Sequence, residues 1–140
     1  MIIADTNVIS DPLSPRPDVR VIDWLDRQFV EEVYITAITI AEMTAGMELL
    51  PLGRRRQDLK NAIEQIIEVQ FAGRILSFDP AAAREYGVLF ARLQRQGMNS
   101  KMADVQIAAI AQCHGASVAT RDVKPFRAAG IRVINPWADE

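Results

Sequence analysis

The amino-acid sequence predicts an α/β fold in which helices cover both faces of a mainly parallel, five-stranded sheet, giving three layers. Short apolar segments alternate with longer amphipathic segments along the chain. This pattern is typical of parallel sheets because right-handed crossovers place helices on both faces. The 140 residues, 49% of them hydrophobic, suffice for one buried core and not for two. We therefore predict a single domain over residues 1–140.

Five short apolar segments are the predicted strands. In chain order they are Ile2–Ala4, Val33–Thr36, Ile75–Phe78, Ser117–Thr120 and Ile131–Ile134. The segment Asp11–Pro17 contains three prolines, which fix the backbone and remove hydrogen-bond donors. It is therefore predicted to be a connecting loop rather than a helix or a central strand.

The segments between the strands carry apolar stripes at helical spacing. One stripe comprises Leu59, Ile63, Ile66 and Ile67, and a second comprises Tyr86, Leu89, Phe90 and Leu93. The helix with the second stripe is predicted to begin at Asp79-Pro80, a good N-cap and first-turn pair, and to stop at Gly97. A further helix is predicted from Ser100 to His114.

The composition argues against export and membrane insertion. No apolar run approaches the roughly 20 residues that cross a bilayer, and the first residues lack the basic and apolar regions of a signal peptide. The lone Cys113 can form no internal disulfide, which fits a reducing compartment. We expect a cytoplasmic protein with no membrane partner. Its net charge of −2 hides basic runs such as Arg54-Arg55-Arg56, so the local field matters more than the total.

Four carboxylates fall where a predicted strand ends or a predicted helix begins. Asp5 and Asp122 directly follow strands, Glu42 lies just past a strand, and Asp104 lies in the first turns of a helix. In such a sheet the carboxyl ends of the strands and the N-termini of the covering helices share one edge, where ligands bind. The spacing alone does not give the strand order. The four acids are therefore predicted to lie along the same edge of the sheet, but the spacing does not predict that they meet in a single site.

Two interpretations of the four acids are open. Acids gather near helix N-termini because the dipole and the free amide groups favour them, and Glu42 could close a capping box with Thr39. Against this, Glu42 and Asp104 fall at core-facing helical spacing, and an unpaired buried ion is costly. Clustered carboxylates raise one another's pKa unless a cation binds, and all-oxygen ligation selects Mg²⁺ or Mn²⁺. The spacing alone favours neither interpretation.

Four segments resemble, in order, the four acidic motifs of the PIN-domain family. They are Asp5-Thr6-Asn7-Val8-Ile9-Ser10, Thr39-Ile40-Ala41-Glu42, Ala103–Ala111 and Ala119-Thr120-Arg121-Asp122. The similarity spans essentially the whole chain, and the ending Asn135-Pro136-Trp137 resembles VapC-type toxins of the FitB-like branch. Two features depart from the family pattern. Asp11 stands where relatives often have Glu, and Met98-Asn99-Ser100-Lys101 replaces a more usual Arg-Pro-Ile loop, which leaves the substrate preference open.

The resemblance implies a strand order of 3-2-1-4-5, which places the strands that carry Asp5 and Asp122 side by side. It implies the toxin of a type II toxin-antitoxin system, an endoribonuclease that uses Mg²⁺ or Mn²⁺ and metal-activated water to hydrolyse RNA. Such toxins are usually homodimers. A cognate antitoxin covers the site, and operator DNA is reached only through that antitoxin.

Carried over position by position, the resemblance makes all four acids catalytic and metal-binding residues. Asp5 and Asp104 would be the principal ligands, and Glu42 would bind the metal directly or through water. Asp122 would serve a second metal or position water. The residues implied to support the acids are Asn7 and Thr120, and the basic residues that could contact RNA are Arg121, Lys124 and Arg127.

Two other functions are open at this point. The chain could act mainly as the partner of a DNA-binding antitoxin in transcriptional autoregulation, with apolar segments such as Leu49-Leu50-Pro51-Leu52 forming the interface. It could also be a phosphotransfer domain, since receiver and phosphatase folds gather aspartates at strand ends. Those folds need a phosphoacceptor Asp with a well-placed Lys, or an Asp-x-Asp pair, and Asp5-Thr6-Asn7 supplies neither.

Overall fold

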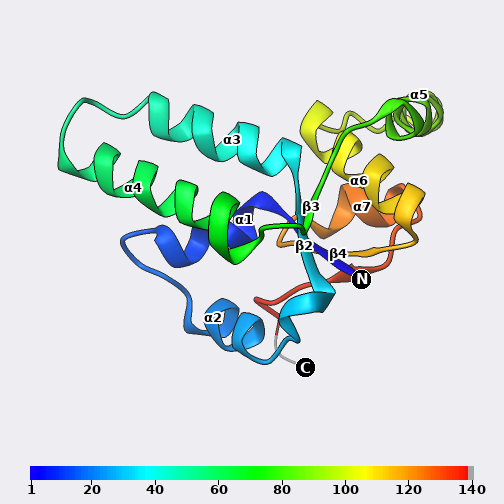
Figure 1. Ribbon diagram of the computed structural model, residues 1–140. Coiled ribbons are helices and arrows are strands. Elements are labelled where there is room, and N and C mark those ends of the chain that lie inside the picture. Colours follow the sequence, from blue (N-terminus) through cyan, green and yellow to red (C-terminus); the bar gives the residue numbers. More distant parts are fainter. Residues whose placement is uncertain (139–140) are drawn as a thin grey trace.

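The computed structural model describes residues 1–138 and contains a five-stranded sheet with strand order β3-β2-β1-β4-β5 (Figure 1). The strands are β1 (Ile2–Ala4), β2 (Val33–Thr36), β3 (Ile75–Leu76), β4 (Ser117–Ala119) and β5 (Val133–Ile134). Every neighbouring pair in the sheet is parallel. The predicted fold class and strand order are confirmed.

Seven α-helices surround the sheet in the described part of the chain. They are α1 (Thr6–Ser10), α2 (Val19–Asp26), α3 (Ala37–Glu48), α4 (Arg54–Gln65), α5 (Pro80–Arg95), α6 (Met102–His114) and α7 (Val123–Ala128). Short 3-10 turns occupy Asp11–Leu13 and Val30–Glu32, and a π-helical turn at Ile66–Gln70 extends α4. Helices α3 and α4 form a long hairpin that projects from the sheet (Figure 1).

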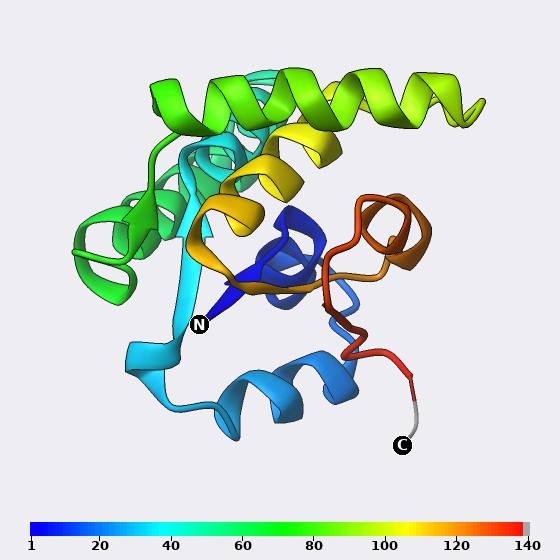
Figure 2. The same ribbon diagram turned by 90° about the vertical axis from the view of Figure 1, so that its right-hand side faces the viewer.

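Each face of the sheet has its own core, because successive residues of a strand point to opposite faces. Ile3 of β1 and Val118 of β4 belong to a buried cluster with residues of α5, α6 and α7. Ala4 of β1 and Ile35 of β2 belong to a second cluster with residues of α1, α2, α3 and α4. Figure 2 shows α5 and α6 on one side of the strands and α2 on the other. The predicted three layers are confirmed.

Helix boundaries follow local capping chemistry. The Asp79 carboxylate accepts a hydrogen bond of 2.9 Å from the Ala82 N–H and so caps α5, as predicted. Gly115 ends α6 with φ 61°, a left-handed conformation that glycine adopts at little cost. No helix within residues 1–138 is both long enough and apolar enough to cross a bilayer.

Several boundaries differ from the prediction. The three C-terminal strands are shorter than predicted, because each ladder ends where its short neighbour ends. The helix predicted from Ser100 begins at Met102, and part of the predicted loop Asp11–Pro17 forms a 3-10 turn. Helices α1, α2 and α7 were not predicted. Helices α1 and α7 are too short to show a periodic stripe, whereas α2 is amphipathic and its pattern was missed.

Candidate active site

Asp5 is a buried carboxylate at the centre of a polar network at the carboxyl edge of the sheet. It follows β1 directly and is the N-cap of α1, accepting a hydrogen bond of 2.8 Å from the Thr6 N–H at Oδ1. Its other oxygen, Oδ2, accepts a hydrogen bond of 2.8 Å from the Thr120 hydroxyl. The pairing of Ala4 with Ala119 in β1 and β4 places Thr120 at this position. The Asp5 side chain is fixed in direction and almost without solvent contact, since only 3% of the residue is exposed.

Asn7 links Asp5 to Asp122. Its amide nitrogen donates to Asp5 Oδ2, Thr120 Oγ1 and Asp122 Oδ2 at 3.4, 3.3 and 3.4 Å. The Thr120 hydroxyl oxygen also accepts from the Asp122 N–H at 3.0 Å, and Asn7 Oδ1 accepts from the Arg121 N–H at 3.3 Å. Asn7 and Thr120, both predicted to support the acids, thus contact Asp5 and Asp122 directly.

Glu42 joins the same network from α3. The Thr6 hydroxyl donates to Glu42 Oε1 at 2.6 Å and lies 3.1 Å from the Thr39 hydroxyl. Sequence reasoning missed Thr6, although its position between Asp5 and Asn7 in the first motif was a signal.

For Glu42, the predicted inward-facing position is wrong, and the capping box that was open as an alternative is not formed. The inward-facing stripe of α3 is Thr39, Met43 and Met47, so Glu42 lies beside it on the exposed rim. The helix is capped by Thr36, whose hydroxyl accepts from the Thr39 N–H at 3.3 Å, and Glu42 therefore closes no capping box with Thr39.

Asp104 faces the network from the first turn of α6, where it is half-buried. Burial raises the pKa of its carboxyl, and the charges of Asp122 and Glu42 raise the pKa further, while Lys101 lowers it. Ile107, Ala108 and Ala111, on the same helical face, are buried as predicted. Asp104 therefore stands at the open end of an inward-facing stripe.

The pKa of Asp5 is raised from 3.8 to about 6. Burial is the largest cause, hydrogen bonds from Thr120 and Thr6 oppose it, and the charges of Asp104 and Glu42 add to it. The four acids therefore form one electrostatic group: Asp104 and Glu42 act on Asp5, and Asp122 and Glu42 act on Asp104. The structure thus places the four predicted acids at one edge of the sheet, near enough to act on one another's charge but not in mutual contact.

The donor chemistry of this group fits a hard divalent cation. Within residues 1–138, no three Asp, Glu, His or Cys side chains lie close enough to one another to bind the same metal ion. Mg²⁺ does not require this, because it keeps several waters and binds through one or two carboxylates. A buried carboxylate whose charged form is disfavoured by its surroundings, such as Asp5, gains most from a nearby cation.

Two open pockets flank the acids. A pocket of about 480 Å³, which we name the α3 pocket, lies on the side of Thr6, Asn7 and Glu42 and also has Arg55 and Arg121 in its wall. A second, of about 580 Å³, lies on the side of Asp104 and Asp122 and includes Lys101 and Lys124. Of the three basic residues predicted to contact RNA, Arg121 and Lys124 line these pockets, and Arg127 lines neither. The sequence favoured a solvated face for the Arg54-Arg55-Arg56 run over a phosphate contact, and it did not single out Lys101, because only tertiary packing brings Arg55 and Lys101 to the acids.

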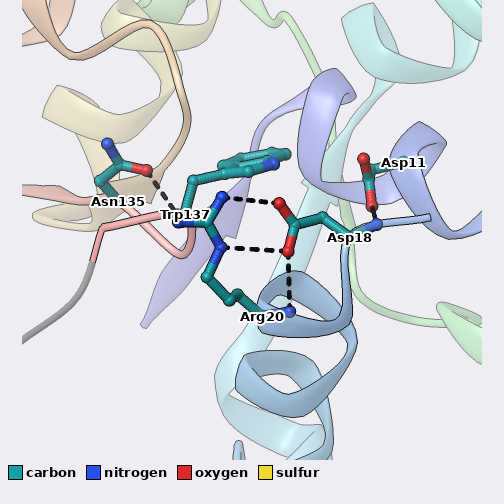
Figure 3. Close-up of polar contacts among 5 residues, drawn as sticks. All are labelled: Asp11, Asp18, Arg20, Asn135 and Trp137. Atoms are coloured by element: carbon teal, nitrogen blue, oxygen red, sulfur yellow. Dashed lines mark hydrogen bonds and ion pairs between the residues drawn. The ribbon is translucent and has the colours of Figure 1, made fainter. Parts of the chain in front are cut away.

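Arg121 is held in place by the C-terminal segment. Its guanidinium lies over the Trp137 ring, 4.3 Å from the centroid. The backbone N–H of Trp137 donates to Asn135 Oδ1 at 3.0 Å (Figure 3). Asp18 pairs with Arg20 at 2.7 Å, and its N–H donates to Asp11 Oδ2 at 2.9 Å (Figure 3). Bonding to Arg20 lowers the pKa of Asp18 to about 2, and the charge of Arg121 adds to this effect.

The fold and the acidic edge define the class of this protein. The PIN-domain family model matches residues 2–131. The chain belongs to the PIN-domain family.

Individual relatives are similar over nearly their whole length. The chain is 46% identical to "Toxin FitB" of Neisseria gonorrhoeae, covering 99% of this chain and 100% of that protein. It is 45% identical to "VapC ribonuclease Y4jK" of Sinorhizobium fredii, covering 98% of each. Among solved structures, "Structure of FitAB bound to IR36 DNA fragment" has a TM-score of 0.93 at 46% identity, covering 100% of this chain and 98% of that one.

Proposed function

We propose that this protein is the toxin of a type II toxin-antitoxin system, an endoribonuclease that depends on a divalent cation, Mg²⁺ or Mn²⁺. The observation that carries the proposal is the convergence of four carboxylates from distant parts of the chain on one sheet edge, around a buried Asp5 with a raised pKa. Capping alone does not account for this arrangement. Glu42 and Asp104 cap no helix, yet both act electrostatically on Asp5.

We assign each acid the role that the family resemblance implies for its position. Asp5 and Asp104 would hold the cation, Glu42 would assist them, and Asp122 would position the attacking water. When bound, the cation supplies charge neutralisation at the phosphodiester. Thr120 keeps Asp5 Oδ2 directed and partly offsets the energetic cost of its charge, since its hydroxyl donates to that oxygen at 2.8 Å.

The basic residues beside the acids would attract the RNA backbone. Arg55 and Arg121 lie on one side of the carboxylates, and Lys101 and Lys124 lie on the other. An RNA chain that crosses the acids therefore meets positive charge before and after the cleaved phosphodiester. Such attraction weakens as salt increases.

We propose a cognate antitoxin as the main protein partner, with operator DNA bound only through it. FitAB, whose solved structure is similar to this chain, is described as bound to a DNA fragment. We also expect a homodimer in a cytoplasmic setting. Exposed apolar residues on α5, Val88 at 61% and Phe90 at 43%, offer a surface for contact between two copies.

The alternative function, a weakly catalytic partner of an antitoxin, has one observation in its favour. Leu49 and Leu52, where α3 turns into α4, are each 86% exposed. Apolar side chains at a projecting tip are suited to contact with a partner. This surface does not exclude catalysis, so only an activity assay distinguishes a ribonuclease from a weakly catalytic partner of an antitoxin.

The test is cleavage of a single-stranded RNA pool by the purified protein with added Mg²⁺ or Mn²⁺. We expect cleavage by the wild type, loss of cleavage in EDTA, and a fall of at least about 100-fold in kcat for Asp104→Asn. Asp58→Asn, on the exposed side of α4, is the matched control, because it also removes one carboxylate and pairs only weakly with Arg54 at 3.9 Å. Cleavage that survives EDTA, or that Asp104→Asn retains at the control level, would refute the proposal.

A further inference from the structure

The α3 pocket shares residues with the acidic site and extends away from it. Glu42 and Asn7 belong to both, and the pocket continues along α3 past Met43 and Gly46. Its volume of about 480 Å³ lies within the range of small-ligand sites. A molecule placed in the pocket is therefore next to the carboxylates that would do the chemistry.

Gly46 and Gly87 are the two glycines inside α-helices of the described chain, and of these two only Gly46 lines the α3 pocket. Gly46 lies inside α3, where glycine is about 1 kcal/mol less favourable than alanine. The folded protein gives no steric reason for this choice, because a Cβ built on Gly46 meets no atom within 4 Å. A side chain at this position would project into open space along the pocket wall. Glycine at this position therefore leaves the pocket wider than any other residue would.

The pocket wall has an apolar part and a charged part. Met43 and Met47 are buried in the inward stripe of α3, and Leu59 of α4 adds to the apolar surface. Arg55 and Arg121 supply two positive charges. The Trp137 ring fixes the Arg121 guanidinium, so this charge is held at the pocket wall rather than free in solvent.

An unpaired nucleotide matches this combination. Its base has flat apolar faces that suit methionine and leucine side chains, and its phosphates suit the two arginines. Proteins read RNA sequence mainly on unpaired bases that are splayed out of the stack. Ser10 and Asp11 also line the pocket and offer polar atoms to a base edge.

We propose that the α3 pocket receives one unpaired nucleotide of the RNA substrate, next to the cleaved bond, and that Gly46 is the residue that admits it. The inference rests on the proposed ribonuclease function and adds to it the place where one base of the target is selected.

The test uses Gly46→Leu, which fills the space with a good helix former, and Gly46→Ala, which fills it only in part. Gly87→Ala is the matched control, because Gly87 is an exposed glycine inside α5, has open space around its Cβ and lies away from the pocket. All three changes should preserve or raise the melting temperature, since each removes a helical glycine. Melting curves therefore separate a blocked pocket from a misfolded protein.

The probe is a fluorescently labelled pool of single-stranded RNA of randomised sequence, with sequencing of the cleaved ends. For Gly46→Leu we expect kcat/KM to fall by about 10- to 100-fold, the range found for losing one base contact. We also expect the base preference at one position beside the cleaved bond to flatten. Gly46→Ala should give a smaller change in the same direction, and Gly87→Ala should match the wild type.

Binding measurements keep this inference separate from the proposed activity. Fluorescence anisotropy with the same pool, in EDTA, reports RNA binding without turnover, and Gly46→Leu should bind more weakly than Gly87→Ala. If the wild type does not cleave RNA but this binding difference is found, the ribonuclease proposal fails and the nucleotide pocket stands. A folded Gly46→Leu variant with control-level binding and unchanged base preference would overturn the inference and leave the pocket to another occupant, such as an antitoxin segment.

Discussion

Replacing Asp5 by Asn is expected to stabilise the metal-free protein while abolishing cleavage. The folded protein raises the pKa of Asp5 from 3.8 to about 6, and each pKa unit corresponds to about 1.4 kcal/mol. At neutral pH the charged side chain therefore destabilises the fold by about 3 kcal/mol. Asparagine removes this charge but accepts more weakly from the Thr120 hydroxyl, at a cost of about 1 kcal/mol. The expected net gain is about 2 kcal/mol.

The sign of the pH dependence follows from the raised pKa. The contribution of Asp5 to stability is fully present below about pH 3.8, where the group is protonated in both states. It is lost as the pH rises through about 6, where the folded protein must release the proton. The advantage of Asp5→Asn should therefore be largest above about pH 7 and should shrink as the pH falls toward 4.

Urea unfolding in EDTA across this pH range measures the effect. The exposed control Asp58→Asn should stay within about 0.5 kcal/mol of the wild type. Adding Mg²⁺ should stabilise the wild type much more than Asp5→Asn, because only the carboxylate gains from the cation. An Asp5→Asn variant that is less stable than the wild type near neutral pH in EDTA would contradict the assigned burial and charge of Asp5.

Three further predictions concern single contacts. Thr120→Val should raise the pKa of Asp5 further and move the acidic limb of the pH–rate profile to higher pH. Thr120→Ser keeps a hydroxyl and should return the limb to its wild-type pH. An unmoved limb in Thr120→Val would mean that the hydroxyl does not act on Asp5. Arg121→Gln should raise KM more than it lowers kcat and should reduce the slope of log KM against log salt by about 0.7. Arg84→Gln on α5 is the control and should leave that slope unchanged. If Arg121→Gln and Arg84→Gln gave equal slopes, Arg121 would have no part in RNA binding. Asp79→Ala should lower the free energy of unfolding by about 1 kcal/mol without changing kcat per folded molecule, because it removes only the cap of α5. A changed kcat would mean that the start of α5 affects the active site.

The sequence predicted the layers of the fold well, because short apolar segments and amphipathic helices alternate along the chain, although several boundaries differ in the structure. Asp79 and Gly115 are local signals, and both act in the structure as expected. The strand order came from the family resemblance and not from periodicity. Helices as short as α1, at Thr6–Ser10, give no periodic pattern, and α1 depends on tertiary packing and on its Asp5 cap.

The acids themselves were predictable, but their surroundings were not. Helix α3 has apolar or small residues on several sides, so the pattern could not decide between the stripe of Glu42 and that of Thr39 and Met43. The stacking of Arg121 on Trp137 and the pocket beside Gly46 depend on chain segments that meet only in the folded protein.

The hydrogen bond between Asp5 and Thr120 joins residues 115 positions apart in the chain. Pairing of β1 with β4 must therefore close nearly the whole polypeptide into a loop, and the entropy of that closure opposes it until the final contacts form. Glu42 and Asp104 sit on helices that gain much of their structure from nearer neighbours, so they can be in place earlier. Assembly of the site therefore requires the long-range pairing of β1 with β4, and a partly folded chain in which these strands are still apart is expected to lack the arrangement around Asp5.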